Sequence, residues 1–130
     1  MDKLAITDDP FVSSTEKGSQ EAGNKVLLRV LVLTCLLEIV TALLRFAVGI
    51  QSTRDFASTI GVLTQGIRIH HSYIGLGMIA VAALRRRRFS SVMRWILIIG
   101  LAFVFSDLIH HFLVLWPITG HPEFDLFYPY

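Results

Sequence analysis

Residues 92–117 read VMRWILIIGLAFVFSDLIHHFLVLWP, and this stretch decides the fold because Arg94 and Asp107 are its only fully charged side chains. Trp95 and Trp116 bracket it, and about 21 residues at ~1.5 Å each separate them by ~32 Å. That distance matches two interfacial aromatic belts on either side of a hydrocarbon core ~30 Å thick. The stretch therefore predicts a transmembrane helix.

The rest of the chain contains two further apolar stretches, residues 25–50 and residues 69–84. The first has about 26 residues, which is enough to cross a ~30 Å core with some tilt. Of the 130 residues, 53% are apolar and only 17% are charged, against about 25% charged in ordinary soluble domains. We therefore predict an all-α membrane protein in which residues 25–117 form three transmembrane helices, running up, down and up.

Polar segments flank this domain on both sides. Residues 1–24 contain few large apolar side chains, so they predict a disordered cytoplasmic tail. Pro117 and Gly120 are helix breakers that end the third apolar stretch. Residues 118–130 are therefore expected to form a short capped tail outside the cell.

Four consecutive arginines, Arg85–Arg88, lie in the short loop between the second and third apolar stretches. Basic residues in short loops mark the cytoplasmic side of a membrane. Three spans then place the N-terminus in the cytoplasm and the C-terminus outside, in a multi-pass protein of the cell membrane. We expect the arginines to contact anionic lipid of the bilayer. A basic surface interleaved with aromatic residues is missing, which argues against a nucleic-acid partner.

Two histidine pairs, His70-His71 and His110-His111, hold four of the five histidines of the chain. Ionisable groups inside apolar spans are costly and usually functional. A rise of ~1.5 Å per residue from the cytoplasmic ends places both pairs, Arg45 and Asp107 at one depth in the outer half of the membrane. Adjacent helical residues point ~100° apart, so we expect each pair to turn one histidine inward.

Asp107 precedes His110 and His111 by three and four residues, a spacing that puts them on one helix face. Helical bundles present metal ligands at this spacing. The candidate metal ligands are His70, His71, Asp107, His110 and His111. Imidazole and carboxylate suit iron, copper or zinc. A b-type haem held between the second and third spans, with Arg45 near its propionates, is the alternative cofactor.

Two short motifs resemble those of known families. The spacing His71-x3-Gly75 is similar to that of some membrane b-type cytochromes, which would imply a haem ligand. The motif Asp107-x2-His110-His111 is similar to one histidine box of membrane desaturases and hydroxylases, with Asp where a His is usual, which would imply a lipid-like substrate. Those enzymes carry more histidines than the five of this chain. Neither motif assigns the chain to a family.

The first apolar stretch carries a polar stripe, because Thr34, Glu38, Thr41 and Arg45 follow steps of four, three and four residues. This stripe must face protein or water rather than lipid. Tyr73, in the second stretch, is a further polar side chain that could donate a hydrogen bond to a ligand.

Three functions remain open from the sequence. The first is the binding of a transition metal or haem at the histidine layer. The second is a membrane-bound oxidase or hydroxylase of a lipid-like substrate. The third is a subunit of a larger membrane complex or a transporter, with a second copy or another membrane protein as partner, in which the polar residues are only interhelical contacts. The sequence does not decide whether the protein is an enzyme.

Overall fold

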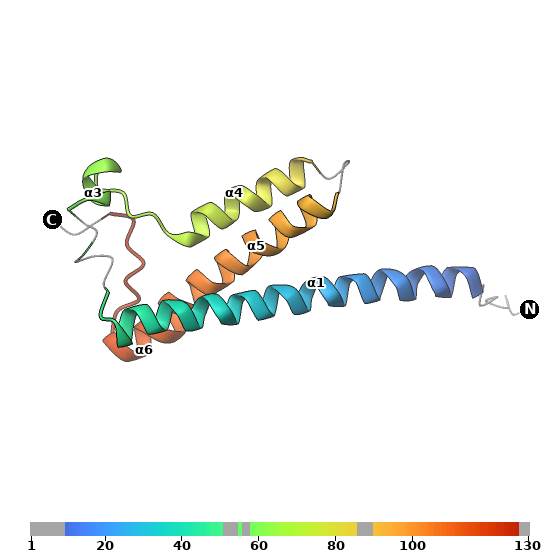
Figure 1. The fold of residues 1–130 in the computed structure, drawn as a ribbon, viewed down its shortest axis with the longest axis horizontal. Coiled ribbons are helices and arrows are strands. Elements are labelled where there is room, and N and C mark those ends of the chain that lie inside the picture. Colours follow the sequence, from blue (N-terminus) through green and yellow to red (C-terminus); the bar gives the residue numbers. More distant parts are fainter. Residues whose placement is uncertain (1–9, 51–54, 56–57, 86–89, 128–130) are drawn as a thin grey trace, which may run out of the picture.

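The computed structural model describes residues 10–50, 55, 58–85 and 90–127, and these residues form helices but no strand (Figure 1). The elements in chain order are α1 (Pro10–Ala42), the π-helical segment η1 (Leu43–Ala47), α3 (Ile60–Leu63), α4 (His71–Leu84), α5 (Ser91–Leu108), the π-helical segment η3 (Ile109–Leu115) and α6 (Trp116–Thr119). The all-α prediction is confirmed for this part of the chain.

Two helices are long and apolar enough to cross a membrane. They are Thr15–Ala47, with 33 residues, and Ser91–Thr119, with 29 residues. The second runs unbroken through α5, η3 and α6. It ends at Gly120, whose φ of 78° is left-handed and therefore favours glycine. Residues 25–47 of the first apolar stretch and all of the stretch 92–117 thus lie in helices of spanning length.

The third predicted span is not shown. α4 has 14 residues, which rise ~21 Å at ~1.5 Å per residue, and this is less than the ~30 Å of a hydrocarbon core. The helix begins at His71 rather than Ile69, because His70 has an extended backbone with φ −89° and ψ 147°. The residues described therefore contain two helices of spanning length and one shorter apolar helix.

α1 begins at Pro10, so residues 10–24 are helical and the prediction of a disordered tail is wrong for them. Proline suits the first turn of a helix, where its missing N–H is not needed. Glu21 and Lys25 form an ion pair of 2.7 Å across one turn. A helix already formed by the apolar residues that follow also extends more easily than a new one begins. Residues 1–9 lie outside the described residues.

The sidedness of the protein is not shown. Arg86–Arg88 of the predicted cytoplasmic block and residues 128–130 of the predicted outer tail lie outside the described residues. The orientation and the contact with anionic lipid stay predictions.

α4 and α5 lie side by side and antiparallel (Figure 1). A Cβ added at Gly75 would lie 2.6 Å from the carbonyl oxygen of Gly100, and one added at Gly100 would lie 2.9 Å from the carbonyl oxygen of Gly75. Only glycine allows two backbones to approach this closely. Gly75 and Gly100 thus allow the backbones of α4 and α5 to meet. The contact holds the start of α4 against α5.

α1 packs on α5 and η3 through its polar stripe. Thr34 is buried, with 4% of its surface exposed, whereas Leu36 and Ile39 on other faces are 53% and 56% exposed. The side chain of Glu38 is also mostly covered, at 15% exposure. The stripe therefore faces protein, as its sequence pattern requires.

Candidate metal centre

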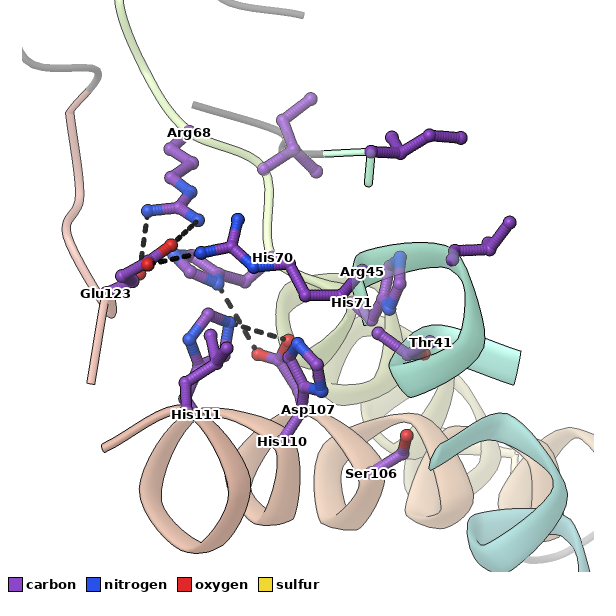
Figure 2. Close-up of a pocket in the computed structure, with 14 residues that line it drawn as sticks. Thr41, Arg45, Arg68, His70, His71, Ser106, Asp107, His110, His111 and Glu123 are labelled. Carbon is purple, nitrogen blue, oxygen red and sulfur yellow. Dashed lines mark hydrogen bonds and ion pairs between the residues drawn. The ribbon is translucent and has the colours of Figure 1, made fainter. Parts of the chain in front are cut away.

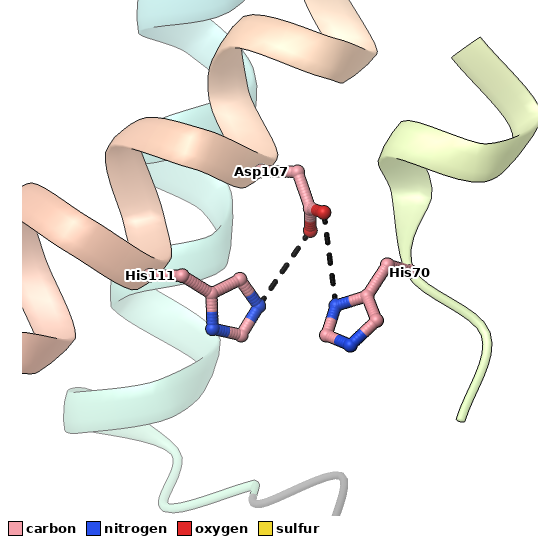
Figure 3. Close-up of side chains that lie close together, drawn as sticks. All are labelled: His70, Asp107 and His111. Carbon is pink, nitrogen blue, oxygen red and sulfur yellow. Dashed lines mark ion pairs between the residues drawn. The ribbon is translucent and has the colours of Figure 1, made fainter. Parts of the chain in front are cut away.

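His70, Asp107 and His111 bring their side chains together where the start of α4 meets the end of α5 and η3 (Figure 3). His70 Nδ1 lies 3.6 Å from Asp107 Oδ2, and His111 Nε2 lies 3.6 Å from Asp107 Oδ1. One possible ligand atom from each residue lies within 4.8 Å of the others. The three residues are 4%, 5% and 5% exposed. This buried cluster, called the His–Asp–His group below, could hold a metal ion.

Each histidine of the group is held from behind by a backbone carbonyl. His70 Nε2 lies 3.1 Å from the carbonyl oxygen of Asp125, and His111 Nδ1 lies 2.6 Å from the carbonyl oxygen of Pro122. A carbonyl oxygen only accepts hydrogen bonds, so the imidazole nitrogen donates in both. A neutral imidazole has one N–H, so the two nitrogens that face Asp107 keep free lone pairs.

The carboxylate of the group accepts a hydrogen bond of 2.6 Å from Ser72 Oγ at Asp107 Oδ2, the oxygen that also faces His70. The nitrogen–oxygen distances of 3.6 Å to His70 and His111 exceed the ~2.7–3.2 Å of a direct hydrogen bond. The two histidines thus lie near different oxygens of one carboxylate, at distances longer than hydrogen bonds.

The two histidine pairs behave differently. His71 is exposed, with its ring 6.0 Å from the ring of Phe103, while His70 is buried, so this pair turns one member inward as predicted. His110 and His111 are both buried, at 8% and 5% exposure, so the prediction of one inward member is wrong there. The reason is that η3 is covered on two sides. Glu38 of α1 contacts His110, whereas His70 and the C-terminal segment contact His111.

His110 forms a direct pair with α1. Its Nδ1 lies 3.0 Å from Glu38 Oε1. The other carboxylate oxygen, Glu38 Oε2, is buried without a hydrogen-bond partner. This contact joins η3 to α1 and stands apart from the His–Asp–His group. Of the five candidate metal ligands, the structure thus brings three together in the group, while His71 and His110 line the same cavity outside the group.

The remaining predicted polar residues surround the group without joining it. Tyr73 meets the ring of His70 edge-on, with ring centroids 5.5 Å apart. Arg45 pairs with Glu123, its Nη2 lying 2.5 Å from Glu123 Oε1. The predicted position of Arg45 in the histidine layer agrees with its place in the wall of the adjoining cavity.

The C-terminal segment His121–Phe127 covers the group. Phe124 stacks on His70 with ring centroids 4.4 Å apart and meets His111 edge-on at 5.2 Å. Glu123 receives both Arg45 and Arg68, and Figure 2 shows the three side chains converging above the histidines. The segment therefore lies over the group as far as Phe127.

Sequence reasoning missed several residues that orient the group: Ser72, Arg68, Pro122, Phe124 and the backbone of Asp125. Pro122 and Asp125 act through carbonyl oxygens, which every residue possesses, so no sequence signal marks them. Arg68 and Glu123 did carry a signal. They are charges in an otherwise apolar chain, and buried charges are usually paired.

A cavity of about 230 Å³ adjoins the group (Figure 2). Its polar wall includes the His–Asp–His group, His110, Arg45 and Arg68. Its apolar wall is formed by Leu44, Ile50, Ile69 and Leu115. The cavity gives a small molecule room beside any ion held by the group.

No protein-family model, curated protein or solved structure matches this chain. The two motif similarities are therefore judged on the geometry. In His71-x3-Gly75, the histidine is exposed, and the backbone of Gly100 packs against the glycine. In Asp107-x2-His110-His111, only Asp107 and His111 belong to the His–Asp–His group.

Proposed function

We propose that this protein is a membrane-embedded metal-binding protein in which His70, Asp107 and His111 hold one divalent transition-metal ion. One observation carries the proposal: a nitrogen of each imidazole lies 3.6 Å from the carboxylate of Asp107, and the other nitrogen of each ring hydrogen-bonds to a backbone carbonyl. Metal-binding histidines almost always donate their other N–H in this way. Two histidines and one carboxylate also form the ligand set of many iron and zinc sites.

A metal ion fits this arrangement better than a haem does. Asp107 lies between the two histidines and is within 3.6 Å of a nitrogen of each. A macrocycle held by both imidazoles would need the space that this carboxylate fills. The close contact of Gly75 with Gly100 also leaves no gap between α4 and α5 at that level. Purified protein is therefore expected to show no Soret absorption band.

The exposed apolar surface supports the membrane location. Leu28, Leu36 and Leu113 are 61%, 53% and 70% exposed and lie on the two helices of spanning length. Soluble monomers rarely leave continuous apolar surfaces of this kind open to water. Lipid is the environment that suits such a surface.

The test is a titration of the full chain, purified in detergent and stripped of metal with a chelator. We expect Zn²⁺ or Co²⁺ to bind at one equivalent per chain. His70→Ala and His111→Ala should each weaken binding by more than the ~10–100-fold that loss of an outer partner costs. Helix content by circular dichroism shows that each variant is folded.

His71→Ala is the matched control, because it removes the adjacent histidine, which is exposed and outside the group. It should leave the affinity for Co²⁺ within ~2-fold of the unmodified protein, since surface changes away from special features have small effects. Absence of saturable binding, or equal losses in His71→Ala and His70→Ala, would refute the proposed site.

A second candidate function, a metal-dependent enzyme acting on a lipid-like substrate, is favoured by the adjoining cavity. Three protein ligands leave a coordination position open, and the apolar wall of Leu44, Ile50 and Ile69 lies beside it. The test adds a medium-chain fatty acid to the Co²⁺-loaded protein. A change in the cobalt absorption bands supports a substrate site beside the ion, and unchanged bands count against it.

A further inference from the structure

Glu123 has a backbone conformation that its side chain does not favour. Its φ is 51°, in the left-handed region that residues other than glycine rarely adopt. Such a conformation costs free energy and persists only where the surrounding structure enforces it. The strained residue lies beside the His–Asp–His group, so what enforces it bears on that group.

Two arginines from different segments enforce the position of Glu123. Arg45 Nη2 contacts its carboxylate at 2.5 Å, and Arg68 Nη1 donates to its backbone carbonyl at 2.6 Å. Arg68 Nη2 lies 3.9 Å from the second carboxylate oxygen. Arg45 lies in η1, and Arg68 precedes α4. The side chains of Arg45, Arg68 and Glu123 are only 12%, 6% and 20% exposed, so solvent screens these contacts weakly.

The same residue separates the two carbonyls that hold the histidines. Pro122 precedes it and accepts from His111 Nδ1, and Asp125 follows two residues later and accepts from His70 Nε2. A rotation of the backbone at Glu123 would move these two carbonyls relative to each other. One or both imidazoles would then lose the partner that fixes its N–H.

We infer that Glu123 is a positioning residue for the metal centre. Its contacts with Arg45 and Arg68 fix the carbonyls of Pro122 and Asp125, and these keep the nitrogens that face Asp107 free of hydrogen. The consequence for metal affinity rests on the proposed metal-binding function. The effect on the imidazoles does not, because it concerns the metal-free protein.

The first experiment therefore uses metal-free protein. Nitrogen-15 NMR of the histidine rings, under conditions where both imidazoles are neutral, distinguishes an N–H at Nδ1 from one at Nε2. The full chain should show His70 with its hydrogen on Nε2 and His111 with its hydrogen on Nδ1. Glu123→Gln should convert at least one of these rings to a mixture of the two forms.

Glu21→Gln is the matched control for this experiment. It makes the same chemical change at a glutamate of α1 that is 68% exposed and lies outside the cavity lining. It should leave both rings as in the unmodified protein. Identical ring spectra for Glu123→Gln and the unmodified protein, or the opposite forms in the unmodified protein, would overturn the inference.

The second experiment measures the affinity for Co²⁺. Glu123→Gln should lose ~10–100-fold, the usual effect of removing an outer partner of a metal ligand, while Glu21→Gln should lose almost nothing. Arg45→Gln removes the other partner of the Arg45–Glu123 contact. The double variant Arg45→Gln, Glu123→Gln should therefore lose less Co²⁺ affinity than the product of the two single-variant factors. A helix content equal to that of the unmodified protein shows that the fold is retained.

The two experiments separate the two proposals. If the unmodified protein binds no metal, the proposed function fails, and the ring spectra alone decide the role of Glu123. If it binds Co²⁺ but Glu123→Gln binds equally well, the role of Glu123 is refuted and the proposed function stands.

Discussion

The Glu38–His110 pair and the His–Asp–His group use the same two residue types in neighbouring places, yet they are built differently. In the pair, the imidazole nitrogen and the carboxylate oxygen meet directly at 3.0 Å. In the group, the corresponding distances are 3.6 Å, and the imidazole N–H groups point away to backbone carbonyls. The pair is a direct contact, although Glu38 Oε2 has no partner among the described residues, whereas the nitrogens of the group that face Asp107 lie beyond hydrogen-bond distance of it. The outer partner of a histidine thus decides its role, more than its residue type or its depth in a membrane.

The largest effect expected from this comparison comes from the carboxylates. Asp107→Ala removes the oxygen ligands that lie between the two histidines. The affinity for Co²⁺ should fall by more than ~100-fold, since loss of a ligand exceeds the ~10–100-fold cost of an outer partner. Glu38→Ala removes the carboxylate of the pair, which is neither a ligand of the group nor a partner of one. The affinity for Co²⁺ should therefore change by less than ~3-fold. Equal losses in a titration of the two variants would erase the distinction between pair and group.

A second expected effect comes from the contact between α4 and α5, which supports the group from its α4 side. Gly75→Ala should lower the free energy of unfolding by ~1–3 kcal/mol, because the added Cβ collides with the backbone of Gly100. It should also weaken metal binding, since a shift of α4 moves His70 away from Asp107. Thermal unfolding in detergent and a Co²⁺ titration measure the two effects.

Gly77→Ala is the control for this change, because a Cβ at Gly77 meets nothing within 4 Å. Alanine is the better helix former, so this variant should be as stable as the unmodified protein or more so, by up to ~1 kcal/mol. Equal stability of both variants would show that α4 and α5 are not held by this close approach.

A smaller effect is expected at Ser72, the outer partner of the carboxylate. Ser72→Ala removes the hydrogen bond of 2.6 Å to Asp107 Oδ2, and the affinity for Co²⁺ should fall by ~10-fold. Ser106→Ala makes the same exchange one residue before Asp107 at a buried serine, so it controls for loss of a hydroxyl near the site. Similar affinities for the two variants would contradict an orienting role of Ser72.

The sequence predicted the fold where one physical signal dominated. Apolar length identified the helices that contain residues 25–47 and 92–117, because a long apolar stretch has few alternatives to a helix. It failed for residues 69–84, since apolar composition did not reveal that His70 takes an extended backbone and that α4 starts only at His71. The prediction also failed for residues 10–24. Their polar composition indicated disorder, but they extend the helix that the following apolar residues form.

The sequence predicted which residues of the candidate site lie at one depth, but it did not predict the directions and contacts of their side chains. Helical spacing placed Asp107 and His111 on one face, and depth placed His70 near them. The inward direction of both His110 and His111 depends on which elements cover η3, which only the tertiary structure shows. The carbonyls of Pro122 and Asp125 could not be predicted, because backbone groups leave no mark in a sequence.

The smallest expected effect concerns the Glu38–His110 pair. Glu38→Gln keeps the shape of the side chain and its contact with His110, but it removes the charge from the hydrogen bond of 3.0 Å. Hydrogen bonds to charged groups contribute ~1.5–3 kcal/mol and neutral ones ~0.5–1.5 kcal/mol, so a loss of about 1 kcal/mol of unfolding free energy follows. Glu38 Oε2 is buried and has no hydrogen-bond partner among the described residues. An uncharged amide is easier to bury there, so the loss of unfolding free energy should lie at the lower end of this range.

Thermal unfolding in detergent measures this loss, and His110→Asn provides the reciprocal change on η3. If the pair is only an interhelical contact, both variants should lose stability and retain the Co²⁺ affinity of the unmodified protein. A fall in metal affinity without a fall in stability would mean that the pair belongs to the metal centre. The division of the histidine layer into a structural half and a metal-binding half would then be wrong.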